Sequence, residues 1–170
     1  REIESPKGYV LSEEEIAVTI GKVDEVVEIE LVNYFIKGNI ALTKVDEDYP
    51  DNKLSGAVFE VYSDTNGDGK LDKDDTLLGE MKELDGGVYQ MSELRFGKYL
   101  VKETKAPTGF VLDENVYSVS VEENGKTYTV ENKAGVGFIN AAQKGSLKIV
   151  KTSSDGKVEG FSFRVTGVDY

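Results

Sequence analysis

Apolar and polar residues alternate along most of the chain, and this two-residue period is the feature that most limits its fold. Rows such as Ala57/Phe59/Val61 and Tyr117/Val119/Val121 place apolar side chains on one face of an extended segment. Turns rich in glycine separate the rows, as at Asp85-Gly86-Gly87 and Glu123-Asn124-Gly125. Several short strands with turns between them predict an all-β fold in which two sheets pack as a β-sandwich.

The sequence also repeats itself at the spacing of one small domain. Residues 1–11 return as residues 102–112, and residues 33–38 return as residues 140–145. We therefore expect a fragment of a longer tandem array. The predicted units are residues 1–37 as the C-terminal part of one module, residues 38–143 as a complete module, and residues 144–170 as the N-terminal part of a following module.

Composition excludes several classes of function. The 170 residues include no Cys and no His, which removes disulfides, thiolate metal sites and the usual general base of hydrolases. A net charge of −12 opposes binding to nucleic acid or to anionic membrane surfaces. No stretch is long and apolar enough for membrane insertion in this segment. A chain without Cys that must survive outside a cell needs some other means of stabilisation.

The alternation fails at three places, where a polar residue ends an inward apolar row. The rows are Ile40-Leu42-Lys44, Tyr99-Val101-Glu103 and Val136-Phe138-Asn140. Burying an unpaired ammonium or carboxylate costs several kcal/mol, so such groups must pair or become neutral. The pattern is compatible with a buried Lys–Glu ion pair that has Asn as a hydrogen-bond acceptor. It is also compatible with three strand ends facing solvent, or with a reactive site.

The reactive alternative has a definite chemistry. Burial lowers the pKa of Lys44 and raises that of Glu103, which favours a neutral amine and a protonated acid. Glu103 would donate a hydrogen bond to the Asn140 carboxamide oxygen, Lys44 would attack the polarised carbon, and ammonia would leave. Folding supplies the proximity. The product is one side-chain amide per molecule, so the reaction is self-processing and not enzymatic turnover, and it needs no cofactor.

These residues resemble the collagen-adhesin B-type domains, also called SpaA-like or prealbumin-like modules, of Gram-positive pilins and surface adhesins. The matching motifs are Thr43-Lys44-Val45-Asp46, Leu54-Ser55-Gly56-Ala57-Val58-Phe59-Glu60-Val61, Gly97-Lys98-Tyr99-Leu100-Val101-Lys102-Glu103, Ala106-Pro107-Thr108-Gly109-Phe110 and Phe138-Ile139-Asn140. The resemblance implies tandem Greek-key, immunoglobulin-like or prealbumin-like β-sandwich modules. It also implies an isopeptide bond between Lys44 and Asn140, with Glu103 as the proton shuttle.

The resemblance extends to the partial modules and to function. It makes Glu2, Asn33 and Lys151 the equivalent residues there, although neither partial module holds all three. It implies an extracellular location, on the cell wall of a Gram-positive bacterium, and a structural stalk or pilin-like role. The expected partners are neighbouring modules of the same protein. A host extracellular ligand is expected if the chain is instead a ligand-binding adhesin domain, and a third alternative is an accessory β-sandwich of a secreted enzyme.

An acidic segment at residues 64–75 has the spacing of a twelve-residue calcium loop. Oxygen ligands stand at positions one, three and five, with Gly at six and an apolar residue at eight. The predicted Ca²⁺ ligands are Asp64, Asn66, Asp68, Asp72 and Asp75, with the Lys70 carbonyl as the backbone ligand. Asp75 stands where the pattern usually has the longer Glu, which weakens the expected affinity. The alternative is a solvated acidic turn between two strands.

Overall fold

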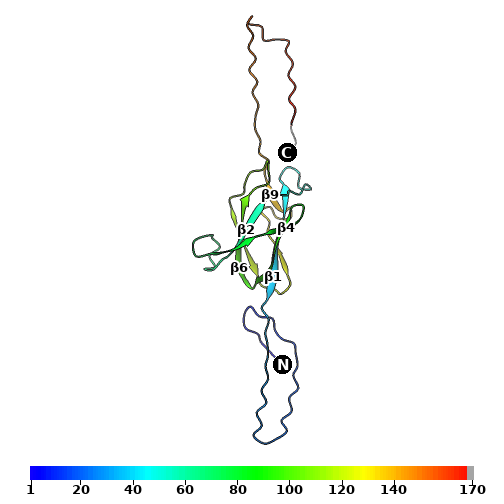
Figure 1. Cartoon of the computed structure of the whole chain (residues 1–170), viewed down its shortest axis with the longest axis vertical. Helices are drawn as coiled ribbons and strands as arrows, with labels where there is room; N and C mark the ends of the chain where they lie inside the picture. The colour runs from blue at the N-terminus through cyan, green and yellow to red at the C-terminus, as the bar shows by residue number, and fades with distance from the viewer. Residues whose placement is uncertain (168–170) are drawn as a thin grey trace.

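A computed structural model describes residues 1–167 and shows a central β-sandwich with an extended segment at each end (Figure 1). The strands of the sandwich are β1 (Lys37–Asp46), β2 (Val58–Ser63), β3 (Thr76–Glu80), β4 (Lys82–Asp85), β5 (Val88–Arg95), β6 (Gly97–Lys105), β7 (Val116–Val121), β8 (Thr127–Thr129) and β9 (Phe138–Asn140). Residues 1–167 contain no helix, and therefore none that could cross a membrane. The all-β prediction is confirmed.

The strands form two sheets. One sheet has the order β4-β5-β1-β8, with β9 also paired to β1, and the other has the order β3-β2-β6-β7. Strand β1 is antiparallel to β5 but parallel to both β8 and β9. The first and last strands of the module therefore lie side by side, and the chain enters and leaves the sandwich along neighbouring strands.

The core lies between the two sheets, where the predicted inward rows meet. Ile40 and Leu42 from β1 are fully buried, as are Phe59 from β2 and Val101 from β6. The Phe138 ring from β9 packs edge-on against Phe59, with ring centroids 5.0 Å apart. Such edge-to-face contacts add to the stabilisation that comes from area burial alone. The period-two rows thus face inward as predicted.

The backbone around Lys44 is held from two sides. The Lys44 N–H donates to the carbonyl of Gly87, and its carbonyl accepts from the N–H of Leu54, at 2.7 and 2.9 Å. Gly87 has a φ of +82°, and a Cβ there would lie 2.8 Å from the backbone nitrogen of Leu54. Only glycine fits this close approach without strain. The turn between β4 and β5 thereby fixes the strand that carries Lys44.

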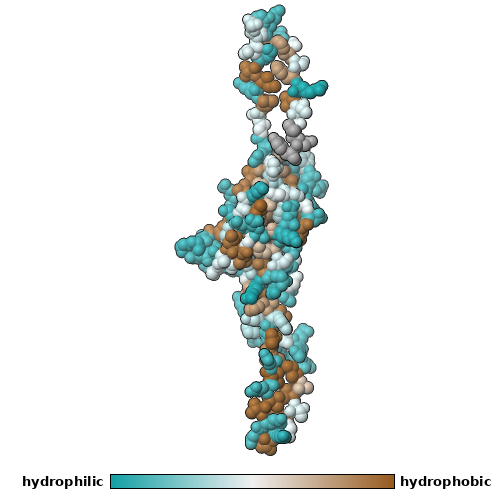
Figure 2. Space-filling model, in the orientation of Figure 1, coloured by the Kyte–Doolittle hydropathy of each residue, from teal (hydrophilic) through white to brown (hydrophobic). Residues whose placement is uncertain are grey.

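The flanking parts of the chain leave the sandwich in opposite directions (Figure 1). We call residues 1–36 the head segment and residues 144–167 the tail segment; the last three positions of the predicted third module, 168–170, lie outside the described residues. Each segment forms a long, open hairpin with exposed apolar side chains (Figure 2). Apolar residues of these segments, such as Ile29 and Ile149, are exposed, because no second sheet of the described residues packs on them.

Candidate functional site

Lys44, Glu103 and Asn140 meet between the two sheets. Their exposed fractions are 0%, 0% and 3%. Lys44 comes from β1 and Asn140 from β9 in one sheet, whereas Glu103 comes from β6 in the other. The inward row of each strand ends at the same level of the sandwich, so the three polar ends form one buried cluster. Three strand ends facing solvent, one of the alternatives left open by the sequence, is therefore wrong.

Glu103 lies between the other two side chains. The distance from Lys44 Nζ to Glu103 Oε1 is 3.7 Å. The Asn140 amide nitrogen donates to both carboxyl oxygens of Glu103, at 3.0 Å each. Lys44 Nζ also donates to the Phe138 carbonyl at 3.1 Å and lies 5.0 Å from the centre of the Phe138 ring. Glu103 thus contacts both nitrogens that would exchange places in an amide transfer.

Burial shifts the pKa values of the two titratable groups toward each other. Loss of solvation lowers the pKa of Lys44 to about 8, although the negative charges of Glu103 and Asp113 oppose this. Loss of solvation likewise raises the pKa of Glu103, against the hydrogen bonds from the Asp113 N–H and Asn140 and the charge of Lys44. The neutral amine and the neutral acid are therefore closer in free energy to the ion pair than they would be in water.

One detail of the cluster differs from the prediction. Glu103 is predicted to contact the carboxamide oxygen of Asn140, but the contact is made by the amide nitrogen. An ionised carboxylate only accepts hydrogen bonds, so it attracts the NH₂ group. Within residues 1–167, Asn140 Oδ1 is left buried with no hydrogen-bond partner. Glu103 is consequently placed beside the group that would leave as ammonia.

Two residues of the cluster's surroundings were missed by the sequence analysis. The Asp113 N–H donates to Glu103 Oε2 at 2.8 Å, and the Asp113 carboxylate accepts from the Asn132 side chain at 2.8 Å. Both residues lie in irregular segments, where the two-residue period gives no signal. The internal repeat does not indicate Asp113 either, because the residue ten positions after Glu2 is Ser12, whereas the residue ten positions after Glu103 is Asp113.

The head segment reproduces part of the cluster. The Asn33 amide donates to Glu2 Oε1 at 2.7 Å, and the Ser12 N–H donates to Glu2 Oε2 at 2.8 Å. Lys151, the equivalent lysine, lies in the tail segment at the other end of the molecule, where its Nζ is 4.3 Å from the centre of the Phe161 ring (Figure 1). The structure therefore brings Glu2 and Asn33 together without Lys151.

The predicted calcium loop projects from the sandwich between β2 and β3 (Figure 1). Asp64 is buried, and its two carboxyl oxygens accept the N–H groups of Gly67 and Gly69. The Asp75 carboxylate closes the loop by accepting from Thr65 and Asp72. Within residues 1–167, no three acidic side chains converge closely enough to hold a metal ion. The oxygen-rich donor set suits Ca²⁺ chemically, and in the described geometry its carboxylates bind the backbone of the loop.

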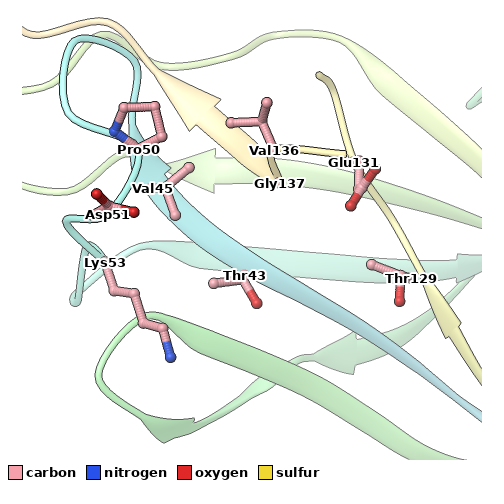
Figure 3. A pocket seen from close by; sticks show the side chains of 9 residues that line it. All are labelled: Thr43, Val45, Pro50, Asp51, Lys53, Thr129, Glu131, Val136 and Gly137. Atoms are coloured by element: carbon pink, nitrogen blue, oxygen red, sulfur yellow. The ribbon is translucent and has the colours of Figure 1, made fainter. Parts of the chain in front are cut away.

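A separate hollow lies on the opposite face of β1. It is lined by Thr43 and Val45, the two neighbours of Lys44, together with Gly137 and Glu131 (Figure 3). Because successive side chains of a strand point to opposite faces, this hollow is on the other side of β1 from the Lys44 amine. It gives no access to the buried cluster.

A sequence comparison matches the central module to one known family. The family model for the SpaA domain, described as a prealbumin-like fold domain, matches residues 38–134. No curated protein sequence matches the chain.

Several solved structures resemble this one. The Bacillus anthracis TIE protein is 29% identical, with a TM-score of 0.66 over 84% of this chain and 24% of that protein. BcpA, the major pilin subunit of Bacillus cereus, is 26% identical, with a TM-score of 0.47 over 64% of this chain and 31% of that one. The minor pilin of Streptococcus agalactiae is also 26% identical, with a TM-score of 0.47 over 70% and 51%. The chain thus spans about a quarter to a half of these proteins.

Proposed function

This chain belongs to the SpaA family of prealbumin-like domains, and from that membership we propose that its central module is a pilin-like structural unit closed by a Lys44–Asn140 isopeptide bond. The observation that carries the proposal is the complete burial of Lys44 and Glu103 beside the Asn140 amide. A buried ion pair alone is weak support for stability, since desolvation offsets most of its attraction. A covalent product would remove both charges from the core.

The reaction that fits the geometry is an amide transfer. The lone pair of neutral Lys44 Nζ attacks the side-chain carbonyl carbon of Asn140, and protonated Glu103 gives its proton to the Asn140 amide nitrogen. The C–N bond of the Asn140 amide breaks, ammonia leaves, and Glu103 takes up the proton that Nζ releases. The contacts of Glu103 with both nitrogens, at 3.7 and 3.0 Å, support this shuttle. One C–N bond forms, one breaks, and no oxidant or metal takes part.

The bond would join the strands through which the chain enters and leaves the module. Strand β1 is the entry and β9 the exit, and they already pair in parallel. A cross-link that closes a loop of roughly 100 residues restricts the unfolded state and stabilises the fold by about 4 to 5 kcal/mol in the loop-entropy treatment. The module would then resist heat, protease and tension without disulfides.

The loop at residues 64–75 would bind Ca²⁺ in this proposal. Its donor set consists of oxygen atoms only, and Asp64 already organises the loop by accepting two backbone N–H groups. When bound, Ca²⁺ would neutralise the cluster of carboxylates and order the long connection between β2 and β3. The ligands would be Asp64, Asn66, Asp68, Asp72 and Asp75, with the Lys70 carbonyl.

The partners of the central module would be neighbouring modules of the same protein. The exposed apolar residues of the head and tail segments support this, because contiguous apolar surface of this kind marks contacts with other protein elements. The module would lie outside the cell, on the Gram-positive cell wall, and its membership of the SpaA family supports this part of the proposal.

The intact mass of the folded protein tests the bond. The wild-type chain is expected to weigh less than its sequence mass by one ammonia, and digestion should yield a linked pair of peptides that contain Lys44 and Asn140. Glu103→Gln keeps the size of the side chain but cannot shuttle protons, so this variant should show the full sequence mass. A wild-type chain at full mass would refute the proposed bond.

A further inference from the structure

We propose that Asp113 and Asn132 form a positioning pair, which holds the Asn140 side chain against Glu103 and thereby sets the rate of bond formation. The inference rests on the proposed Lys44–Asn140 bond. Within the described residues, the side chains of Asp113 and Asn132 make no hydrogen bond to Lys44 or to the side chain of Asn140.

Asn132 acts on the strand that carries Asn140. Its Oδ1 accepts the N–H of Ile139 at 2.6 Å, and its Nδ2 donates to the Ile139 carbonyl at 2.9 Å. One side-chain amide thus makes the two hydrogen bonds that a neighbouring strand would make. Strand β9 has only three residues, and in the described part of the chain β1 is the one strand paired with it. Asn132 therefore holds the free edge of β9 one residue before Asn140.

Asp113 connects this contact to the acid. Its Oδ2 accepts from Asn132 Nδ2 at 2.8 Å and from the Tyr117 hydroxyl at 2.7 Å, while its own N–H donates to Glu103 Oε2 at 2.8 Å. Asp113 therefore links the strand that carries Glu103 to the residue that holds β9. Because reacting groups must be placed to within a fraction of an ångström, the loss of this link should slow the reaction.

The Asp113 carboxylate also adds a fixed negative charge to the site. Burial alone would raise its pKa, but hydrogen bonds from Tyr117, Asn132 and Asn115 lower the pKa overall, so Asp113 stays ionised. Its charge raises the pKa of both Lys44 and Glu103. The titratable groups that face it are Lys44 on β1, Glu103 on β6 and Tyr117 on β7. Glu47 and Asp113 both line a surface hollow beside Asn140.

The head segment provides an internal comparison. Ser12 takes the place of Asp113 there, and its N–H donates to Glu2 at the same distance of 2.8 Å. The Ser12 hydroxyl, however, accepts from the N–H of Glu14. The backbone contact with the acid is therefore common to both segments. The side-chain link from Asp113 through Asn132 to the asparagine strand is a feature of the complete module.

The test follows bond formation over time. The full chain is synthesised in a cell-free system, translation is stopped, and samples quenched in denaturant are weighed for the loss of ammonia. Asn132→Ala is expected to close the bond about tenfold to a hundredfold more slowly than wild type. Asn115→Ala is the matched control, because Asn115 also donates to Asp113 but makes no hydrogen bond to β9 within the described residues. This variant should form the Lys44–Asn140 bond at nearly the wild-type rate.

Two further measurements separate positioning from general stability. Thermal unfolding of Asn132→Ala in a Glu103→Gln background, where no bond forms, checks that the variant folds. Asp113→Asn removes the negative charge, which lowers the pKa of both Lys44 and Glu103. The pH range of reaction should therefore move to lower pH, and a purely structural role would slow the reaction equally at every pH.

The outcomes distinguish the inference from the proposed function. If the wild-type chain never loses ammonia, the bond itself is refuted. If the wild-type chain loses it and folded Asn132→Ala does so at the same rate, the bond stands and the positioning pair is refuted. Equal slowing by Asn115→Ala and Asn132→Ala, or an unshifted pH range for Asp113→Asn, would also contradict the inference.

Discussion

A proton moves between Lys44 and Glu103 when the ion pair converts to a pair of neutral groups. The ion pair and the pair of neutral groups hold the same number of protons, so their ratio does not change with pH as long as the pair as a whole keeps its protons. Only the neutral pair combines a nucleophilic amine with an acid that can protonate a leaving group. Burial, which lowers the pKa of Lys44 and raises that of Glu103, increases the share of this reactive form.

The rate of bond formation should consequently have a plateau in pH. It should fall on the acidic side below the raised pKa of Glu103, because Lys44 stays protonated there. It should also fall on the alkaline side above the pKa of Lys44, which is about 8, because the pair has then lost the proton that the two groups share. Mass analysis of quenched samples across the pH range measures this. A rate that keeps rising through the alkaline range would show that no protonated acid is needed.

The sequence predicted the three members of the cluster but not their supports. Lys44, Glu103 and Asn140 each end a row of alternating apolar residues, so their inward direction follows from the strand period. Asp113 and Asn132 act through an irregular segment, and their contacts depend on the three-dimensional path of the chain. The side of the Asn140 amide that faces Glu103 likewise depends on the charge of the acid, which the sequence pattern does not encode.

At the scale of elements, the long β2–β3 connection differs from the other connections of the sandwich. It carries five Asp residues between positions 64 and 75, and its carboxylates bind the loop's own backbone. Repulsion between these charges opposes the compact loop, and a bound cation would relieve it. Asp64 and Asp75 lie at the two ends of the loop, so a bound ion would fasten both ends to the sandwich.

Calcium should therefore stabilise the module. Saturation at 100 times the dissociation constant adds about 2.7 kcal/mol of unfolding free energy. Thermal unfolding with Ca²⁺ and with a chelator measures the effect. Asp72→Ala removes a predicted ligand and should reduce the stabilisation, whereas Asp74→Ala removes the same charge from a position outside the ligand set and should retain it. Equal melting temperatures with calcium and chelator would contradict the site.

The elements themselves were predictable wherever one face of a strand is buried. The rows at Phe59, Val101 and Phe138 face the core as their alternation indicates. Ile29 and Ile149 also lie in alternating rows, in the head and tail segments, but both are exposed in the described structure. Period alone shows which residues share a face, but burial also requires a second sheet to cover that face.

At the scale of the whole molecule, the head and tail segments extend from opposite ends of the sandwich (Figure 1). Force applied through them enters at β1 and leaves after β9. With the proposed bond closed, the load would pass from Lys44 directly to Asn140. The core of the sandwich, including both sheets between these residues, would stay outside the loaded path.

Single-molecule pulling should show this difference. The wild-type module is expected to keep the residues between Lys44 and Asn140 folded and not to lengthen. The Glu103→Gln module should unfold and release roughly 300 Å of chain, at about 3.3 to 3.6 Å per extended residue. An equal gain in contour length for the two proteins would show that no Lys44–Asn140 bond carries the applied force.

The parallel pairing of β1 with β9 has a mechanical meaning of its own. The chain leaves β1 toward one end of the molecule and leaves β9 toward the other, so a pulling force loads the two strands in shear. In this geometry their hydrogen bonds must break together and cannot open one after another. Strand β9 contributes only three residues to resist this sliding. A single amide across that short overlap would join the two strands covalently and prevent them from sliding past each other.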